Sequence, residues 1–334
     1  MLFSIIIVIM ISLGFSHFRT EIQKQSYQEY MPEPTNAQAI TETVIAQTHQ
    51  SDLTNDDLLQ DNLHQMKKTS LENLQISMNK PEIFYRNKVA VLTYHHLDPV
   101  ESSVTITPDR FKSHLEALKN NGFHVISVED FVDFLQKKKT VPSNSVVITF
   151  DDGYESVYKY AYPILKSEGM TATFFLIVSY IEDGTVRMPP ILNWKEIIEM
   201  HNDGFSFYSH TFNSHETVAV KKGEELSKLT AKLFNQSANR IETEKEYKSR
   251  IRDDLTEADD ILNAKLGNKI NLLCLPHGKY NQEVVDIANQ SQIPFLFTGV
   301  EGINSDNIKL IKRINAGSPY MSDKLLIKRL SQGK

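Results

Sequence analysis

Cysteine is almost absent from this chain. Its 334 residues include a single cysteine, Cys274, so a disulfide within the chain is impossible and a zinc site built from several cysteines is excluded. Positive charge is not in excess either, because 36 lysines and arginines stand against 42 aspartates and glutamates. The formal net charge of −6 argues against nucleic acid as a partner. Any bound metal must therefore be held by histidine and carboxylate side chains.

Glycine is missing from residues 17–86, where nine of the 15 glutamines lie between Glu21 and Gln75. Residues 17–53 also lack the apolar periodicity that a buried core requires. Over residues 55–79 apolar side chains recur at helical spacing, after a capping box at Thr54. We therefore predict that 17–86 is a polar spacer that contains an amphipathic helix. This helix docks either on the domain that follows or on a partner.

Long apolar runs are also scarce, and the longest lies at the start of the chain. Leu2–Phe15 carries no charge and is shorter than the roughly 20 residues that a membrane crossing needs. This pattern predicts a signal peptide or a membrane anchor at residues 1–16. We therefore expect an extracellular protein that is either secreted or associated with the cell surface or membrane through its N-terminus.

From residue 87 onward short apolar runs alternate with amphipathic segments, and 40% of the chain is hydrophobic, enough for a packed core. About eight strands separated by helices predict an α/β domain at 87–334, built on a parallel sheet that is open or closed into a barrel. The charged stretch at 216–260 is predicted to be a helical, solvated insertion. The expected strands are 88–94, 123–126, 145–150, 171–178, 205–209, 270–275, 294–298 and 308–311. Helices are expected at 109–121, from 127 onward, and at 155–168, 193–202, 282–290 and 323–330.

Four of the predicted strands end in aspartate or histidine, namely Asp151 with Asp152, His210 with His215, His95, and His277. Because the carboxyl ends of parallel strands meet at one edge of a sheet, we expect these side chains to lie close together. Two histidines and one carboxylate leave coordination positions open, as catalytic metal sites do, and the spare aspartate can act as a general base. Taken singly, each segment also fits a turn, a helix cap or a surface histidine.

The segment Thr149–Gly153 resembles the Thr-Phe-Asp-Asp-Gly motif of the carbohydrate esterase family 4 polysaccharide deacetylases, the NodB-homology domain. Thr171–Phe175 is similar to the segment that follows this motif in the family, and Ser209–Thr211 with His215 resembles the second family motif. The resemblance extends over residues 88–316. It implies a distorted (β/α)7 barrel and a metal-dependent deacetylase.

The resemblance also implies roles for individual residues. Asp151 is the general base, while Asp152, His210 and His215 hold a divalent metal, with zinc as the first choice and cobalt or nickel as alternatives. The residues expected to contact the sugar chain are Pro276, His277, Trp194 and Tyr280. A core position is an equal alternative for the single tryptophan.

Two features of the family are missing. The C-terminal Leu-x-His motif that supplies the general acid has no counterpart, because no histidine follows His277 and the matching region reads Ile311–Ile314. The arginine of the third family motif is also absent, and Leu273 stands near its place. His95 is therefore the candidate general acid, or the residue that holds the product acetate.

Within the family the chain is most similar to the exported deacetylases of poly-β-1,6-N-acetylglucosamine, in the segments Tyr94–His96, Leu192–Trp194 and Leu275–Tyr280. This resemblance predicts a monomeric enzyme that releases acetate from an extracellular N-acetylglucosamine polymer of the biofilm matrix. Peptidoglycan and chitin-type glycans are alternative substrates. The alternative functions are a non-catalytic glycan-binding module and a metal-stabilised scaffold that recruits partners through residues 55–79.

Overall fold

The computed structural model describes residues 64–69, 82–221 and 224–332. Residues 64–69 are helical, and they lie within the range 55–79 for which a helix was predicted. The predicted signal peptide or anchor, the spacer at 17–53 and the rest of that helix lie outside the described residues. Among the described helices, none combines the length and the apolar character that a membrane crossing requires. Residues 80–334 form one compact unit.

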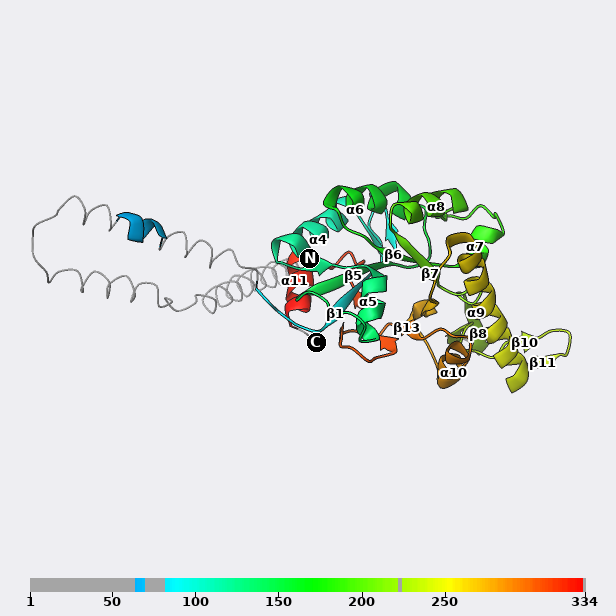
Figure 1. Cartoon of the computed structure of the whole chain (residues 1–334). Coiled ribbons are helices and arrows are strands. Elements are labelled where there is room, and N and C mark those ends of the chain that lie inside the picture. Colours follow the sequence, from blue (N-terminus) through cyan, green and yellow to red (C-terminus); the bar gives the residue numbers. More distant parts are fainter. Residues whose placement is uncertain (1–63, 70–81, 222–223, 333–334) are drawn as a thin grey trace, which may run out of the picture. The chain divides into compact units, whose positions relative to one another are not determined.

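This unit is organised around a 10-stranded sheet (Figure 1). All strand pairs in it are parallel except the pair of β14 with β1. The parallel sheet predicted from the alternation of strands and helices is confirmed. The spatial order is β14 (Ile303–Asn304), β1 (Val89–Tyr94), β5 (Ser145–Phe150), β6 (Thr173–Leu176), β7 (Ser206–Ser209), β12 (Leu272–Cys274), β13 (Phe295–Phe297) and β15 (Leu310–Ile311), with β4 (His124–Val125) beside β5 and β16 (Ile314–Asn315) beside β1.

The two ends of this strand order are joined by the chain that leaves β15. After Ile311 it passes through Lys312 and Arg313 into β16, which pairs with β1. The fully buried Asn304 of β14 fastens the same segment. Its side chain accepts a hydrogen bond from the Lys312 N–H at 2.8 Å and donates one to the Lys312 carbonyl at 2.9 Å. The sheet is therefore a nearly closed barrel, in agreement with the predicted fold class.

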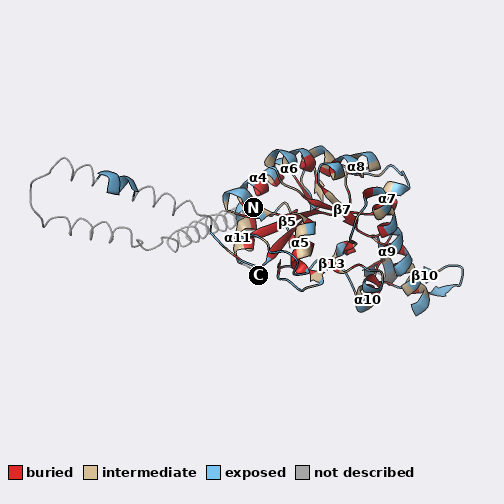
Figure 2. Cartoon of the chain, in the orientation of Figure 1, coloured by how far each residue is buried: buried red, intermediate tan, exposed pale blue. Residues whose placement is uncertain are grey.

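Helices cover the outside of the sheet and turn their polar faces to solvent, whereas the strands are buried (Figure 2). Apolar residues of the strands and of the inner helix faces form the core between the two layers. The helices are α4 (Pro108–Asn120), α5 (Val128–Leu135), α6 (Tyr162–Glu168), α7 (Val178–Glu182), α8 (Trp194–Asn202), α9 (Glu244–Leu266), α10 (Gln282–Gln290) and α11 (Asp323–Ser331).

Local sequence signals explain where most of these helices begin. The Ser127 hydroxyl accepts a hydrogen bond from the Asp130 N–H at 3.1 Å, and so caps α5 as expected. The helix predicted at 155–168 is irregular, because Val157–Ala161 form a π-helical turn before α6. Pro163 explains this change, since proline has no N–H to donate to the carbonyl one helical turn earlier.

The prediction of a solvated helical insertion at 216–260 is wrong for its first half. Residues 217–241 form two hairpins, β8 (Thr217–Lys221) with β9 (Glu224–Ser227), and β10 (Phe234–Asn235) with β11 (Arg240–Ile241). Helix α9 then begins at a capping box of Thr243 and Glu246, and it buries one face against the core. Most of its charged side chains lie on the other face, although Asp254 and Asp259 are buried, so high charge indicated an amphipathic helix and not a solvated one.

Candidate active site

Strand alternation decides which side chains point into the barrel. Val89 and Val91 of β1 lie in the interior apolar cluster together with Val147 of β5. Because side chains alternate along a strand, Thr93 and His95 continue the interior face of β1, and Asp151 continues that of β5. Two strands that are paired in register thus deliver a histidine and an aspartate to the same end of the barrel.

The same alternation places residues from three more strands. Tyr208 of β7, Leu272 of β12 and Ile311 of β15 all lie in the interior cluster. Two residues further along, these strands present His210, Cys274 and Arg313. The chemically active side chains therefore converge at the carboxyl end of the barrel because each follows an inward-facing apolar residue.

A cavity of about 400 Å³ lies among these side chains. Thr93 Oγ1 and His95 Nδ1 are buried there, and neither has a hydrogen-bond partner among the described residues. Buried polar groups are normally paired, so a bound molecule or water is the natural partner for these two atoms. The lining residues are Thr93, His95, Val104, Asp151, Asp152, His210, His215, His277, Gly278, Thr298, Gly299, Glu301, Arg313 and Asn315.

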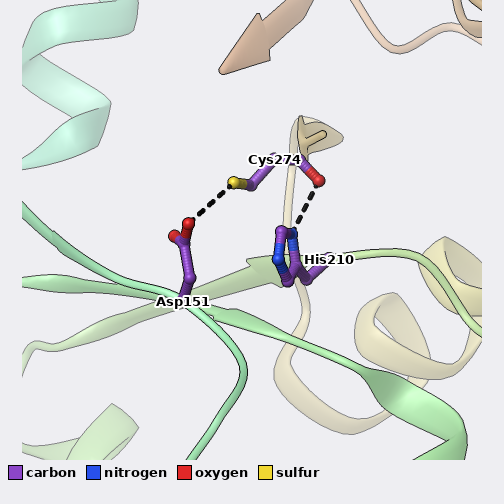
Figure 3. A group of neighbouring side chains, drawn as sticks. All are labelled: Asp151, His210 and Cys274. Atoms are coloured by element: carbon purple, nitrogen blue, oxygen red, sulfur yellow. Dashed lines mark hydrogen bonds between the residues drawn. The ribbon is translucent and has the colours of Figure 1, made fainter. Parts of the chain in front are cut away.

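Asp151 is the most enclosed acid of this cavity, with 2% of its surface exposed. Arg313 donates from Nη1 to both of its carboxylate oxygens, at 2.8 and 2.9 Å. The Cys274 thiol lies 3.4 Å from Asp151 Oδ2 (Figure 3), and His95 Nε2 lies 3.8 Å from the same atom. Burial opposes ionisation, but the charges of Arg313, His210 and His95 outweigh it and lower the pKa of Asp151. This carboxylate is thus ionised and ready to accept a proton.

Asp152 reaches the cavity through an unusual backbone conformation. Alternation alone would turn it away from Asp151, but its φ of 72° reverses the chain, and Gly153 follows with a φ of 78°. Its Oδ1 lies 3.1 Å from His215 Nε2 and 3.4 Å from His210 Nε2. Burial disfavours the charged form, yet hydrogen bonds from the two histidines hold the pKa of Asp152 well below its ordinary value.

The ligand atoms of Asp152, His210 and His215 all lie within 4.8 Å of one another, close enough to hold one metal ion. His210 Nδ1 donates a hydrogen bond to the Cys274 carbonyl at 2.8 Å (Figure 3). That bond leaves Nε2 as the nitrogen that faces Asp152, as in metal-binding histidines whose other N–H is held by a carbonyl. Two imidazoles and one carboxylate fit a divalent cation with open coordination positions.

His277 supports the second histidine of this group. Its Nε2 donates a hydrogen bond to the His215 carbonyl at 2.8 Å, and the two rings lie 4.8 Å apart. Burial lowers the pKa of His277, so the ring is neutral near pH 7. The next residue must be glycine, because a Cβ at Gly278 would come within 2.4 Å of the backbone of Gly299.

Three residues that were predicted to contact the sugar chain do not line the cavity. Pro276 is buried in a short 3-10 turn, Pro276–Gly278, and Tyr280 is exposed outside the cavity. Trp194 donates from its indole N–H to Glu182 at 2.6 Å and packs against the core. Trp194 is thus half-buried beside the core, and His277 is the residue of this set that reaches the cavity.

Sequence reasoning missed Arg313. The region Ile311–Ile314 was interpreted only as a place where a histidine motif is absent, and the arginine of the third motif was judged missing. In the structure a guanidinium does face Asp151, but it comes from the end of β15 and not from β12. Aspartates and histidines were selected because they follow predicted strands. Arg313 also follows a predicted strand, 308–311, so the same criterion would have found it if arginine and lysine had been considered.

Comparison with known proteins points to the polysaccharide deacetylases. Residues 138–296 match the family model described as polysaccharide deacetylase. The chain is 26% identical over 236 residues to poly-beta-1,6-N-acetyl-D-glucosamine N-deacetylase of Staphylococcus epidermidis, an alignment that covers 66% of this chain and 75% of that protein. It is 23% identical over 244 residues to the Escherichia coli K12 protein of the same name, covering 68% of this chain but 36% of the relative.

A solved structure shows the same fold. The de-N-acetylase from Aggregatibacter actinomycetemcomitans superimposes with a TM-score of 0.65 at 27% sequence identity. The match covers 72% of this chain and 99% of that chain. The similarity therefore extends over most of this chain and nearly all of that one.

Proposed function

Because this chain carries a polysaccharide deacetylase domain, we propose that it removes acetyl groups from poly-β-1,6-N-acetyl-D-glucosamine by hydrolysis, releasing acetate and leaving free amines. The two relatives named above act on this polymer by name. The observation that carries the proposal is the pairing, in one cavity, of an ionised, arginine-held Asp151 with the Asp152, His210 and His215 group.

In the proposed reaction each residue has one task. A divalent cation held by Asp152, His210 and His215 would polarise the acetamide carbonyl and acidify a water molecule. Asp151 accepts the proton of the attacking water, and Arg313 keeps this carboxylate ionised and oriented.

His95 then donates a proton to the leaving amine nitrogen. It lines the cavity, and its Nε2 lies 3.8 Å from Asp151 Oδ2. A backbone N–H near His277 is proposed to stabilise the developing oxyanion.

The bound metal is proposed to be zinc. Imidazole nitrogen with a single carboxylate is a ligand set that zinc takes in catalytic sites, and cobalt or nickel could replace it in the same geometry.

The domain limits are proposed as 1–16 for the signal peptide or anchor, 17–86 for the polar spacer with its helix, and 87–334 for the deacetylase domain.

The cellular setting is proposed from the N-terminal sequence. The apolar run Leu2–Phe15 supports export, with the enzyme either secreted or kept at the cell surface. We propose that it acts there as a monomer on the polysaccharide of the biofilm matrix. Each removed acetyl group leaves an amine that is positively charged near neutral pH, which would help the polymer adhere to anionic surfaces.

The experiment is an assay of acetate release by the purified chain from poly-β-1,6-N-acetyl-D-glucosamine, with β-1,4-linked chitin oligomers and peptidoglycan in parallel. It is run with zinc, with chelator, and with Asp151→Asn. We expect metal-dependent release from the 1,6-linked polymer and a loss of at least about 10³-fold in the variant. If acetate is released preferentially from chitin or peptidoglycan, that glycan and not the 1,6-linked polymer is the substrate. If the native chain releases no acetate and Asp151→Asn still binds the polymer, the protein is a glycan-binding module and not an enzyme.

A further inference from the structure

The two predicted metal-binding histidines are joined by a loop with no regular secondary structure, residues 210–215. Such a loop holds two imidazole rings in place only if its peptide groups are fixed. Part of the fixing is local, since the Thr211 N–H donates to Ser209 Oγ at 3.0 Å and the Ser214 N–H to Thr211 Oγ1 at 3.1 Å. These bonds leave the middle of the loop, Phe212 and Asn213, to be held from elsewhere.

The middle of the loop is held by a carboxylate from a distant part of the chain. Asp254, on helix α9, accepts a hydrogen bond from the Phe212 N–H at 3.2 Å through Oδ1, and from the Asn213 N–H at 2.8 Å through Oδ2. The side chain is buried, with 9% of the residue surface exposed. One buried carboxylate thus fixes two successive peptide groups of the loop relative to α9.

Helix α9 is itself immobilised by packing, so it can act as a fixed support. Ile251 and Leu255, which flank Asp254, are fully buried in the apolar cluster beneath α10. Ala258 and Leu262, further along the same helix, belong to the core beneath the barrel strands. The position of the carboxylate is therefore set by the core and not by the loop that it holds.

We propose that Asp254 is a positioning residue for the metal site, and that it sets the affinity for the metal by clamping the loop between His210 and His215. This inference rests on the proposed function only in taking these two histidines as metal ligands. Groups that orient metal ligands without touching the metal typically change affinity about 10- to 100-fold when they are removed.

The test measures zinc affinity of the full chain by competition with a chromophoric chelator, which does not depend on catalysis. In Asp254→Asn the side chain keeps its shape, but one of the two backbone N–H groups now faces an amide N–H₂ donor. We expect zinc to bind about 10-fold more weakly to this variant and up to about 100-fold more weakly to Asp254→Ala. Acetate release at limiting zinc should fall accordingly and recover when free zinc is raised.

Asp259→Asn is the matched control. Asp259 is a buried carboxylate of the same helix, with 5% exposure, and it makes no hydrogen bond to the loop in the described part of the chain. Zinc affinity should be unchanged in this variant. A purely structural role for Asp254 predicts a lower melting temperature with zinc affinity intact.

The outcomes separate this inference from the proposed function. If the native chain binds zinc and Asp254→Asn binds it within about twofold as tightly, the positioning role is overturned while the deacetylase stands. Equal weakening in the Asp259→Asn control would also overturn it, because the effect would then belong to the helix. A native chain that binds no zinc would overturn the proposed metal site, and this inference with it.

Discussion

Replacing Arg313 with methionine tests the link between the end of β15 and the catalytic base. The guanidinium of Arg313 contacts both oxygens of Asp151 and is itself buried, with 7% exposure. Methionine keeps much of the length of the side chain and removes its charge. The buried carboxylate then loses its main cationic partner among the described residues, although His95 and the metal group remain near it.

The size of the effect follows from the geometry. Two unit charges about 4 Å apart interact by about 4 kcal/mol at an effective dielectric constant near 20. A change of about 1.4 kcal/mol is tenfold, so the proton affinity of the Asp151 carboxylate should rise by about 10²- to 10³-fold. The pKa of Asp151, now held low by Arg313, would move up, and the acid limb of the pH–rate profile would move to higher pH.

The assay measures how kcat/KM for acetate release depends on pH, with the enzyme saturated with metal. Arg313→Lys, which keeps the charge but lacks the planar guanidinium, should lie between the native chain and Arg313→Met. The control is Arg252→Met, because Arg252 is an exposed arginine of α9 outside the cavity lining. An acid limb that stays at the native pH in Arg313→Met would refute the reasoning and would mean that the metal alone keeps Asp151 ionised.

Three further predictions concern single side chains. His95→Gln should lower kcat for acetate release by about 10²- to 10³-fold with KM unchanged, and a normal kcat would remove His95 as the general acid. Trp194→Phe should lower the melting temperature and leave KM for the polymer unchanged, since the indole binds Glu182 outside the cavity; a raised KM would return it to the binding surface. Burial, together with the charge of Asp260, raises the pKa of Asp259 to about 7. The native state therefore keeps a proton that the unfolded chain releases near pH 4, and stability falls as pH rises from about 4 to 7. Asp259→Asn should remove this slope and stabilise the protein by about 2–4 kcal/mol above pH 7, as measured by urea unfolding at pH 5 and pH 8; parallel curves for the two proteins would contradict it.

Much of the barrel could be predicted because its signals are local. The strand Ser145–Phe150 is an apolar, β-branched run with a glycine-containing turn after it, and it lies where it was expected. The helix predicted at 282–290 is likewise found there, capped by Asn281. Alternation along such strands also explains why Asp151 and His210 point inward together.

The elements that were misjudged depend on contacts that composition does not reveal. The charge of residues 216–260 suggested a solvated helix, but Thr217–Lys221 pairs with its neighbour as a hairpin and α9 buries a full face. The sugar contacts expected of Trp194 and Tyr280 stay a prediction, and both residues lie outside the cavity lining.

The sequence by itself determined that Asp151 and His210 would meet, because each directly follows a buried parallel strand and such strands end at one edge. Only the tertiary structure decided which remote groups complete the site. Arg313 reaches Asp151 from a strand 162 residues away, and Asp254 holds the histidine loop from a helix 41 residues away. Periodicity is a property of neighbouring residues, whereas the closure of the barrel and the docking of α9 are set by packing between distant segments.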